Sequence, residues 1–499
     1  MTTTFTIIVV YFLVIIGIGF ISRTRAMKSA EDYFVAGRTL GTFAVTMGIP
    51  ATLFSAFVFI ALPGLVYKTG AGFLAGLPIA NFLWTAMIFL VGYKIWLAGK
   101  KFGFITPTEL FRRRFNSDWV AIIIFITMVI FVSPYLALQP MGGGYLLAAI
   151  TKGTIPYAVG AGLITVVLII YAVAGGLRGV AWVDAFQGVV FLFITILTLV
   201  FVAIAVGGLT TGSARIMAEV PALFSPSGPV KLWSWTMCLS WLIFVFLNIM
   251  FQPAIFARYY ACRDVKTLRW SFAMWPIFPF IMLIIPVFIA LYGRILMPNL
   301  DRPDSLIPLL WVKFTPIWFI GLGAAGMLSA LMSTASSQLM VLTSMWTRDI
   351  YVPYVNRDAT ESNQVLVGRL VLIILAALGF AIAFNPPKLM GMLAGASFSA
   401  IAILAPAGIA AFYWRRATAP AVIASIIVGE IPVVFTYFGW ISKKVWLGFD
   451  ASIPGLIIAT VLLVLISYVT KPPPKEAVDA FMSTDMDIFK FIREKQVGA

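Results

Sequence analysis

Four hydroxyl side chains lie within five positions of the segment GMLSALMSTASSQL (326–339). Ser333, Ser336 and Ser337 are spaced i, i+3, i+4 and share one helical face, whereas Thr334 is rotated by about 100° from Ser333. Lone serines in membrane helices usually serve packing, but this density exceeds what packing needs. Neutral oxygen ligands suit a hard monovalent cation such as sodium, so the segment predicts a cation site.

A helix break is predicted in the segment GIPATLFSAF (48–57). Pro50 removes a backbone donor, and Gly48 adds conformational freedom. The carbonyls released there need a partner from protein, water or an ion. Interrupted membrane helices are typical of binding sites near the bilayer midplane, and a simple proline kink is the alternative. Gln252 and Pro253 repeat the pattern weakly later in the chain.

Only two acidic residues, Asp184 and Glu430, fall deep within apolar stretches. Ionisable groups at bilayer depth are costly and are therefore functional candidates. Asp184 follows a Gly-Gly pair in YAVAGGLRGVAWVDAFQG (171–188), and the alternative is an interfacial acid paired with Arg178. Glu430 has no obvious partner and is assigned no role. We expect no Lys or Arg deep in a span.

The elements that must position these groups are membrane helices. Of the 499 residues, 61% are hydrophobic and 11% are charged, with a mean hydropathy of +1.01. Because much of any soluble surface must face water, this composition excludes an ordinary cytosolic enzyme. We predict an all-α polytopic membrane protein with about 13 transmembrane helices, counted as apolar stretches long enough to span a bilayer. The stretches lie near 4–22, 42–67, 72–97, 119–148, 155–174, 180–207, 232–257, 269–293, 315–346, 365–385, 388–414, 418–439 and 451–470.

The organisation predicted is one transmembrane domain over 1–470 and a short cytoplasmic tail over 471–499. The tail segment DAFMSTDMDIFKFIREK predicts either an amphipathic helix on the membrane or a solvated tail. Basic residues concentrate in alternate loops, which favours an N-out/C-in orientation. The net charge of +16 follows from those loops and predicts no nucleic-acid partner. The chain has no His and no Walker motif, so we expect no enzyme activity.

Five segments together resemble the sodium:solute symporter family. They are EDYFVAGRTLG (31–41), LPGLVYKTG (62–70), YAVAGGLRGVAWVDAFQG (171–188), FQPAIFARYY (251–260) and ALMSTASSQLMVLTSMWTRDIY (330–351). The resemblance implies a core of two inverted five-helix repeats (LeuT-type), with one helix before it and about two after it, and alternating access around a central site. It also implies a multi-pass protein of the cell membrane that needs no partner subunit.

The resemblance implies sodium as the coupling ion and suggests its ligands. The principal site would use the carbonyls of Ala51, Phe54 and Ala330 and the side-chain oxygens of Ser333 and Thr334. Some members have a second sodium site, whose positions here are Asp184, Ser333, Ser336 and Ser337. With both sites filled, we expect two sodium ions to accompany each solute.

The expected function is import of a small organic solute, with a monocarboxylate as the preferred solute. FGFITPTELFRRRF (102–115) and SPYLALQPMGGGYLL (133–147) resemble the monocarboxylate branch and, less closely, pantothenate carriers. Solute contacts are expected from Ser55, Gln139 and Gln252, although Gln139 would alternatively bond a neighbouring helix. Proline-carrying members have an aspartate where this chain has Leu53, which argues against proline. The alternatives are a proline-like amino-acid or sugar symporter and, in a different class, a membrane sensor.

Overall fold

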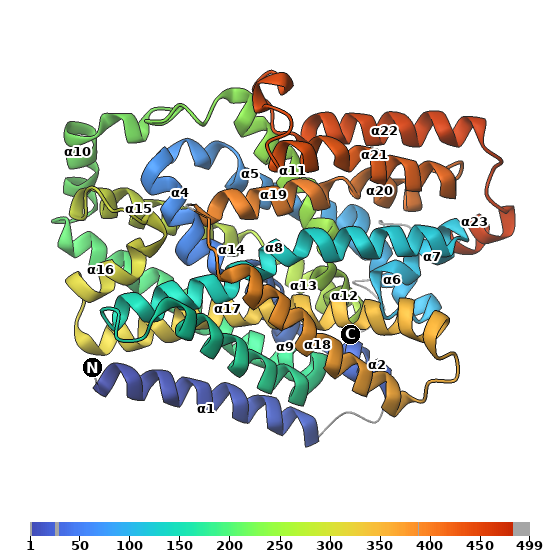
Figure 1. Cartoon of the computed structure of the whole chain (residues 1–499), viewed down its shortest axis with the longest axis horizontal. Coiled ribbons are helices and arrows are strands. Elements are labelled where there is room, and N and C mark those ends of the chain that lie inside the picture. The colour runs from blue at the N-terminus through green and yellow to red at the C-terminus, as the bar shows by residue number, and fades with distance from the viewer. Residues whose placement is uncertain (1, 25–28, 388, 483–499) are drawn as a thin grey trace.

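The computed structural model describes residues 2–24, 29–387 and 389–482 (Figure 1). Within these ranges the chain is all-helical and forms no strand, as predicted. Residues 25–28, which carry part of the predicted inner charge, lie outside the described residues, as does most of the predicted amphipathic tail segment.

The first half of the chain forms two long helices and many shorter ones. Its elements are α1 (Thr2–Thr24), α2 (Ala30–Val35), η1 (Ala36–Arg38), α3 (Thr42–Leu53), η2 (Phe57–Ala61), α4 (Leu62–Thr69), η3 (Ala71–Ala75), α5 (Leu77–Met87), η4 (Ile88–Gly92), α6 (Tyr93–Phe102), α7 (Pro107–Phe115), α8 (Asp118–Ile150), α9 (Tyr157–Ala205), α10 (Leu209–Glu219) and η5 (Pro221–Phe224).

The second half contains the second broken span and a long, largely buried helix over Ile317–Met345. Its elements are α11 (Trp235–Phe251), α12 (Pro253–Ala261), α13 (Val265–Ala273), α14 (Ile277–Pro279), η6 (Phe280–Ile284), α15 (Ile285–Leu296), η7 (Pro303–Ser305), α16 (Leu306–Phe314), α17 (Ile317–Met345), η8 (Trp346–Val355), α18 (Glu361–Ala383), α19 (Met390–Ala402), α20 (Ala405–Tyr413), α21 (Ala419–Tyr437), η9 (Lys443–Trp446), α22 (Ser452–Val469) and α23 (Lys475–Met482).

The number of spans agrees with the predicted thirteen. In the described part of the chain, ten helices are long and apolar enough to cross a membrane, and two bent helix pairs would add two more. One of the ten, α9, has 49 residues, about twice the length that a bilayer requires. Gly176, with φ 55° and ψ −164°, breaks α9 into two limbs, each long enough to span. Counting both limbs gives thirteen.

Helix α17 lies at the centre of the molecule and packs against α9, α1, α8 and α3 (Figure 1). Every residue from Gly323 to Met345 is buried. A helix that is enclosed on all sides has no polar face for solvent, so hydroxyl groups on it depend on partners inside the protein. This helix carries the predicted cation-site residues.

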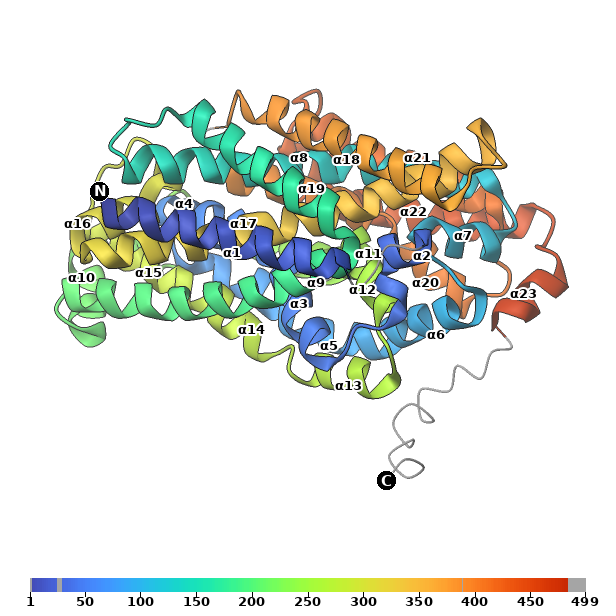
Figure 2. The same cartoon turned by 90° about the horizontal axis from the view of Figure 1, so that it is seen from below.

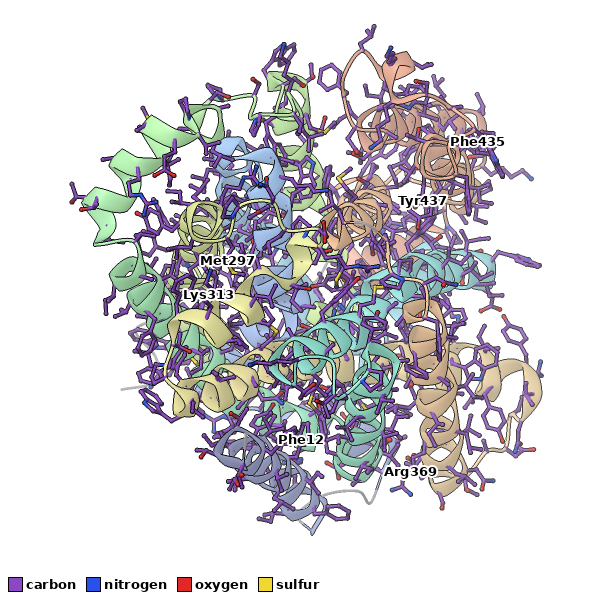
Figure 3. All side chains as sticks on the ribbon, turned by 60° about the vertical axis from the view of Figure 1, so that its left-hand side comes forward. Phe12, Met297, Lys313, Arg369, Phe435 and Tyr437 are labelled. Carbon is purple, nitrogen blue, oxygen red and sulfur yellow. The ribbon has the colours of Figure 1, made fainter. Side chains whose placement is uncertain are left out.

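The outer surface of the bundle is apolar. Side chains fill the space between the ribbons, and carbon predominates on the outside (Figure 3). On the second limb of α9, Val189, Phe193, Val200 and Ile204 are exposed along one face, which suits contact with lipid. The paired helices α21 and α22 lie on the side of the bundle opposite α1 (Figure 1). These are the predicted additions at the two ends of the core.

The first turns of the predicted tail pack on the protein. Helix α23 contacts α7, and Phe481 is fully buried and stacks on Phe102 at 6.0 Å between ring centroids. The start of α1 and helix α23 lie at opposite ends of the bundle (Figure 2). This placement agrees with the predicted N-out/C-in orientation, and the orientation itself stays a prediction, as does the domain boundary at residue 470.

Candidate functional site

The predicted break in the second span is present, but it lies a few residues later than Pro50. Helix α3 continues through Pro50 to Leu53, and the carbonyl of Pro50 accepts a hydrogen bond from Phe54 N at 2.8 Å. The chain then leaves the helix, and the segments before and after the break differ by 47° in direction. Proline removes only its own N–H, so the hydrogen bonds that follow it can still form.

Helix α8 satisfies the backbone at this break. Gln139 Oε1 accepts from Ala56 N at 3.0 Å, and Gln139 Nε2 donates to the carbonyl of Tyr135 at 2.9 Å. Ser55 Oγ accepts from Phe57 N at 3.1 Å and lies 2.8 Å from the Tyr135 hydroxyl. Both polar groups of Gln139 therefore form hydrogen bonds with the backbone. The bond with Ala56 N is the contact with a neighbouring helix that was the alternative for this residue.

The later Gln-Pro pair forms a second break. Helix α11 ends at Phe251 and α12 begins at Pro253, with a bend of 46° between them. The two breaks thus have nearly equal angles, and both lie against α17 or its neighbours. Two broken spans of this kind are the arrangement expected from an inverted repeat with a central binding site.

The structure brings together four of the five residues predicted for the principal sodium site. Ser333 Oγ donates to the carbonyl of Ala51 at 2.7 Å and also lies 3.3 Å from the carbonyl of Ala330. Thr334 Oγ1 lies 3.4 Å from the same Ala51 carbonyl. Phe54, the fifth predicted residue, is the first residue beyond α3. All five residues are buried. These neutral oxygens fit sodium, which binds hard oxygen ligands.

Asp184 contacts Ser336 and Ser337, two of the three serines predicted for the second sodium site, whereas the Ser333 hydroxyl is directed to the carbonyls of Ala51 and Ala330. Asp184 also has a partner that sequence reasoning missed. It is fully buried on α9, and its carboxylate accepts from Ser337 Oγ at 2.7 Å and from Ser336 Oγ at 3.5 Å. Its Oδ2 forms an ion pair with Nη2 of Arg258. The alternative that Asp184 pairs with Arg178 is wrong, because Arg178 instead pairs with Asp32 at 3.1 Å.

Arg258 corrects the expectation that no basic residue lies deep in a span. Its side chain is fully buried on α12, where the sequence had suggested an inner loop. Nη2 also donates to Ser337 Oγ at 2.7 Å and to Thr52 Oγ1 at 3.2 Å. A signal was present in the sequence, since the apolar run that begins near residue 232 continues past Arg258 to Ala261.

A narrow cavity lies beside the α3 break. Its lining is uncharged, with aromatic and aliphatic walls and a few polar groups, and consists of Leu53, Phe54, Phe57, Leu77, Asn81, Tyr135, Val245, Asn248, Ile249, Gln252, Leu283 and Phe398. Of the three predicted solute contacts, only Gln252 belongs to this lining. Ser55 and Gln139 instead accept hydrogen bonds from the backbone at the break. Phe54 is shared, because its side chain lines the cavity while its carbonyl is a predicted sodium ligand.

A chain of amides joins the cavity to α17. Gln252 Nε2 donates to Oδ1 of Asn248 at 2.9 Å, and Gln338 Nε2 donates to Oε1 of Gln252 at 3.1 Å. Gln338 follows Ser337 directly and lies one helical turn beyond Thr334. The cavity side chains of α11 are therefore held by the helix that carries the predicted cation ligands.

Asp304 lies outside the membrane-spanning helices, beside the first residue of α19. It is 2% exposed, and its Oδ2 accepts from Met390 N at the start of α19 at 3.1 Å. Its Oδ1 packs against Gly64, and a Cβ atom added at Gly64 would lie 2.2 Å from that oxygen. Burial raises the pKa of Asp304 to about 7, and the hydrogen bond from Met390 offsets part of that rise.

Glu430 remains without an assigned role. It is 7% exposed on α21, and neither carboxylate oxygen has a hydrogen-bond partner among the described residues.

Known proteins similar to this chain are sodium-coupled carriers. The model of the sodium:solute symporter family matches residues 33–429. The sodium/proline symporters of Staphylococcus aureus strains JH9 and COL are each 27% identical over 99% of this chain and 97% of their own length.

Solved structures show the same fold at lower identity. A sodium-coupled sialic acid symporter in a substrate-bound outward-open state has a TM-score of 0.78 at 21% identity, covering 94% of this chain and 98% of that chain. Mhp1, a nucleobase-cation-symport-1 family transporter in a closed conformation, has a TM-score of 0.59 at 12% identity, covering 92% and 99%. This chain therefore belongs to the sodium:solute symporter family, and it is a multi-pass sodium-coupled carrier of the cell membrane and not an enzyme.

Proposed function

We propose that the protein imports a small monocarboxylate together with sodium by alternating access. The observation that carries the proposal is the uncharged wall of the cavity, to which Leu53 contributes. Leu53 is the position at which the resemblance to proline-carrying members implies an aspartate. A wall without an acidic group offers no partner to an ammonium or iminium group. It suits a solute with an apolar body and one carboxylate, which the polar groups of Tyr135, Asn248 and Gln252 can orient.

The positive potential for the carboxylate comes from the sodium ion and the broken helix. We place sodium between the carbonyls of Ala51, Phe54 and Ala330 and the hydroxyls of Ser333 and Thr334. Phe54 then links the two ligands, because a cation that orders its carbonyl also fixes the side chain that lines the cavity. Sodium binding thereby favours the solute-binding shape, and the reciprocal effect follows from linkage.

A proline-like amino acid is the second candidate solute. It is favoured by the 27% identity to sodium/proline symporters across almost the whole of both chains. Proline and sialic acid, the solutes named for the two kinds of sodium-coupled relative, both carry one carboxylate. The shared carboxylate supports the anion-binding half of the proposal, and the amine is the group that separates the two candidates.

Uptake into proteoliposomes under an inward sodium gradient tests the proposal. The panel contains two- to five-carbon monocarboxylates, proline and other amino acids, with an equal choline gradient as the control. We expect sodium-dependent uptake of a monocarboxylate and little uptake of proline. Leu53→Asp should reverse this preference, because a carboxylate in the wall repels an anion and attracts an amine, whereas Leu53→Asn is the uncharged control of the same size. Uptake of proline alone by the wild type would overturn the monocarboxylate proposal.

A further inference from the structure

The guanidinium of Arg258 contacts Asp184 and Ser337, two of the four residues that were predicted to bind a second sodium ion. Its Nη2 atom contacts Asp184 from α9, Ser337 from α17 and Thr52 from α3. These oxygens come from three different helices and converge on a single nitrogen. This is the kind of position that a monatomic cation would occupy between the same groups.

The way in which the guanidinium is held supports this comparison. Arginine usually pairs with a carboxylate through two parallel hydrogen bonds. Here Nη2 makes all the hydrogen bonds, and Nε and Nη1 have no partner among the described residues although both are buried. Gly48 makes room for the group, since an added Cβ would lie 3.3 Å from Nη1. The side chain therefore places one nitrogen, Nη2, within the cluster, while its Nε and Nη1 donors remain unpaired among the described residues.

Charge balance decides what else the cluster can hold. One carboxylate and one guanidinium, both with fully buried side chains, sum to zero net charge. A sodium ion added beside them would leave one uncompensated positive charge in the protein interior. Repulsion between two unit charges about 4 Å apart at an effective dielectric constant of about 20 would weaken sodium binding by roughly a thousandfold. The cluster has room for one cation, and the chain itself supplies it.

We propose that Arg258 is a tethered cation that takes the place of a second sodium ion, so that each solute is carried with a single sodium. This replaces the expectation of two ions, and it rests on the proposed sodium site at Ser333 and Thr334. A tethered charge stays with the protein through the transport cycle and adds no ion to the coupling. With a monocarboxylate as solute, one sodium moves no net charge, so a tenfold sodium gradient concentrates the solute about tenfold.

Equilibrium binding of ²²Na⁺ to the purified full-length protein tests the proposal without requiring knowledge of the solute. We expect one sodium per wild-type chain and a Hill slope of one. Arg258→Met keeps the length of the side chain but frees the oxygens of Asp184, so it should bind two sodium ions. Adding Asp184→Asn to this variant should return the number to one. Arg178→Met, which removes an arginine from a different ion pair, is the matched control and should still bind one.

Each outcome either supports or overturns the proposal. Two sodium ions per wild-type chain would overturn it, as would one ion in a folded Arg258→Met variant. Because that variant leaves a buried carboxylate unpaired and can fail to fold, Ser336→Ala supplies an independent test. It should bind one sodium with unchanged affinity, and a tenfold loss of affinity would overturn the proposal. Absence of sodium binding by the wild type would instead refute the proposed sodium site itself.

Discussion

Removing the hydroxyl of Ser333 is the most direct test of the proposed sodium site. Ser333 Oγ lies 2.7 Å from the Ala51 carbonyl and joins α17 to the broken α3. In Ser333→Ala the ion loses one of five proposed oxygen ligands. A hydrogen-bonding or ligand contact to a charged group contributes about 1.5–3 kcal/mol, so sodium affinity should fall roughly ten- to hundredfold.

Sodium-dependent stabilisation measures this loss without a known solute. At a sodium concentration about 100 times the wild-type Kd, binding stabilises the folded protein by about 2.7 kcal/mol. The same expression gives about 1.4 kcal/mol for a tenfold weaker variant and about 0.4 kcal/mol for a hundredfold weaker one. The measurement is unfolding of the purified protein in sodium chloride and in choline chloride at equal ionic strength.

Ser329→Ala is the matched control for this experiment. Ser329 lies one helical turn before Ser333, is equally buried, and contacts the Tyr11 hydroxyl and the Ala325 carbonyl instead of Ala51. Each variant loses a neutral hydrogen bond, which lowers stability in choline by about 0.5–1.5 kcal/mol. Only Ser333→Ala should also lose the sodium-dependent part. If the two variants are stabilised equally by sodium, the assignment of Ser333 as a ligand is wrong.

Three further predictions concern Asp304, the amide chain and the orientation. The raised pKa of Asp304 means that the folded protein keeps this proton between pH 3.8 and about 7, so its contribution to stability is complete at low pH and is lost as the pH rises through 7. The difference in unfolding temperature between wild type and Asp304→Asn should therefore change between pH 5 and 8, and a constant difference would contradict this pKa. Gln338→Leu should raise the KM for the solute about two- to tenfold, because Gln252 loses a hydrogen bond, and an unchanged KM would show that the amide chain is not needed. Cysteines introduced at Arg113 and Lys443 should react with impermeant reagents from the inside and the outside respectively, and labelling from one side would refute the N-out/C-in orientation.

The sequence was sufficient to predict the spans and the helix that carries the hydroxyl groups. Hydropathy is a local property, so each apolar stretch identifies a membrane helix without knowledge of its neighbours. The grouping of Ser333, Thr334, Ser336 and Ser337 follows from helical periodicity alone. The breaks after Pro50 and at Gln252 were also predictable, because glycine and proline change the backbone locally.

The tertiary structure was needed to decide which groups meet across helices. The partner of Asp184 is Arg258, 74 residues away on a helix segment that the sequence alone placed in a loop. Local signals carry no information about such a pair, because the contact depends on how α9, α12 and α17 pack together. The residues that line the cavity were undecided for the same reason. Gln139 was attractive as an isolated polar residue, but the position of α8 directs its amide to the backbone of Ala56, while the packing of α11 places Asn248 and Gln252 at the cavity.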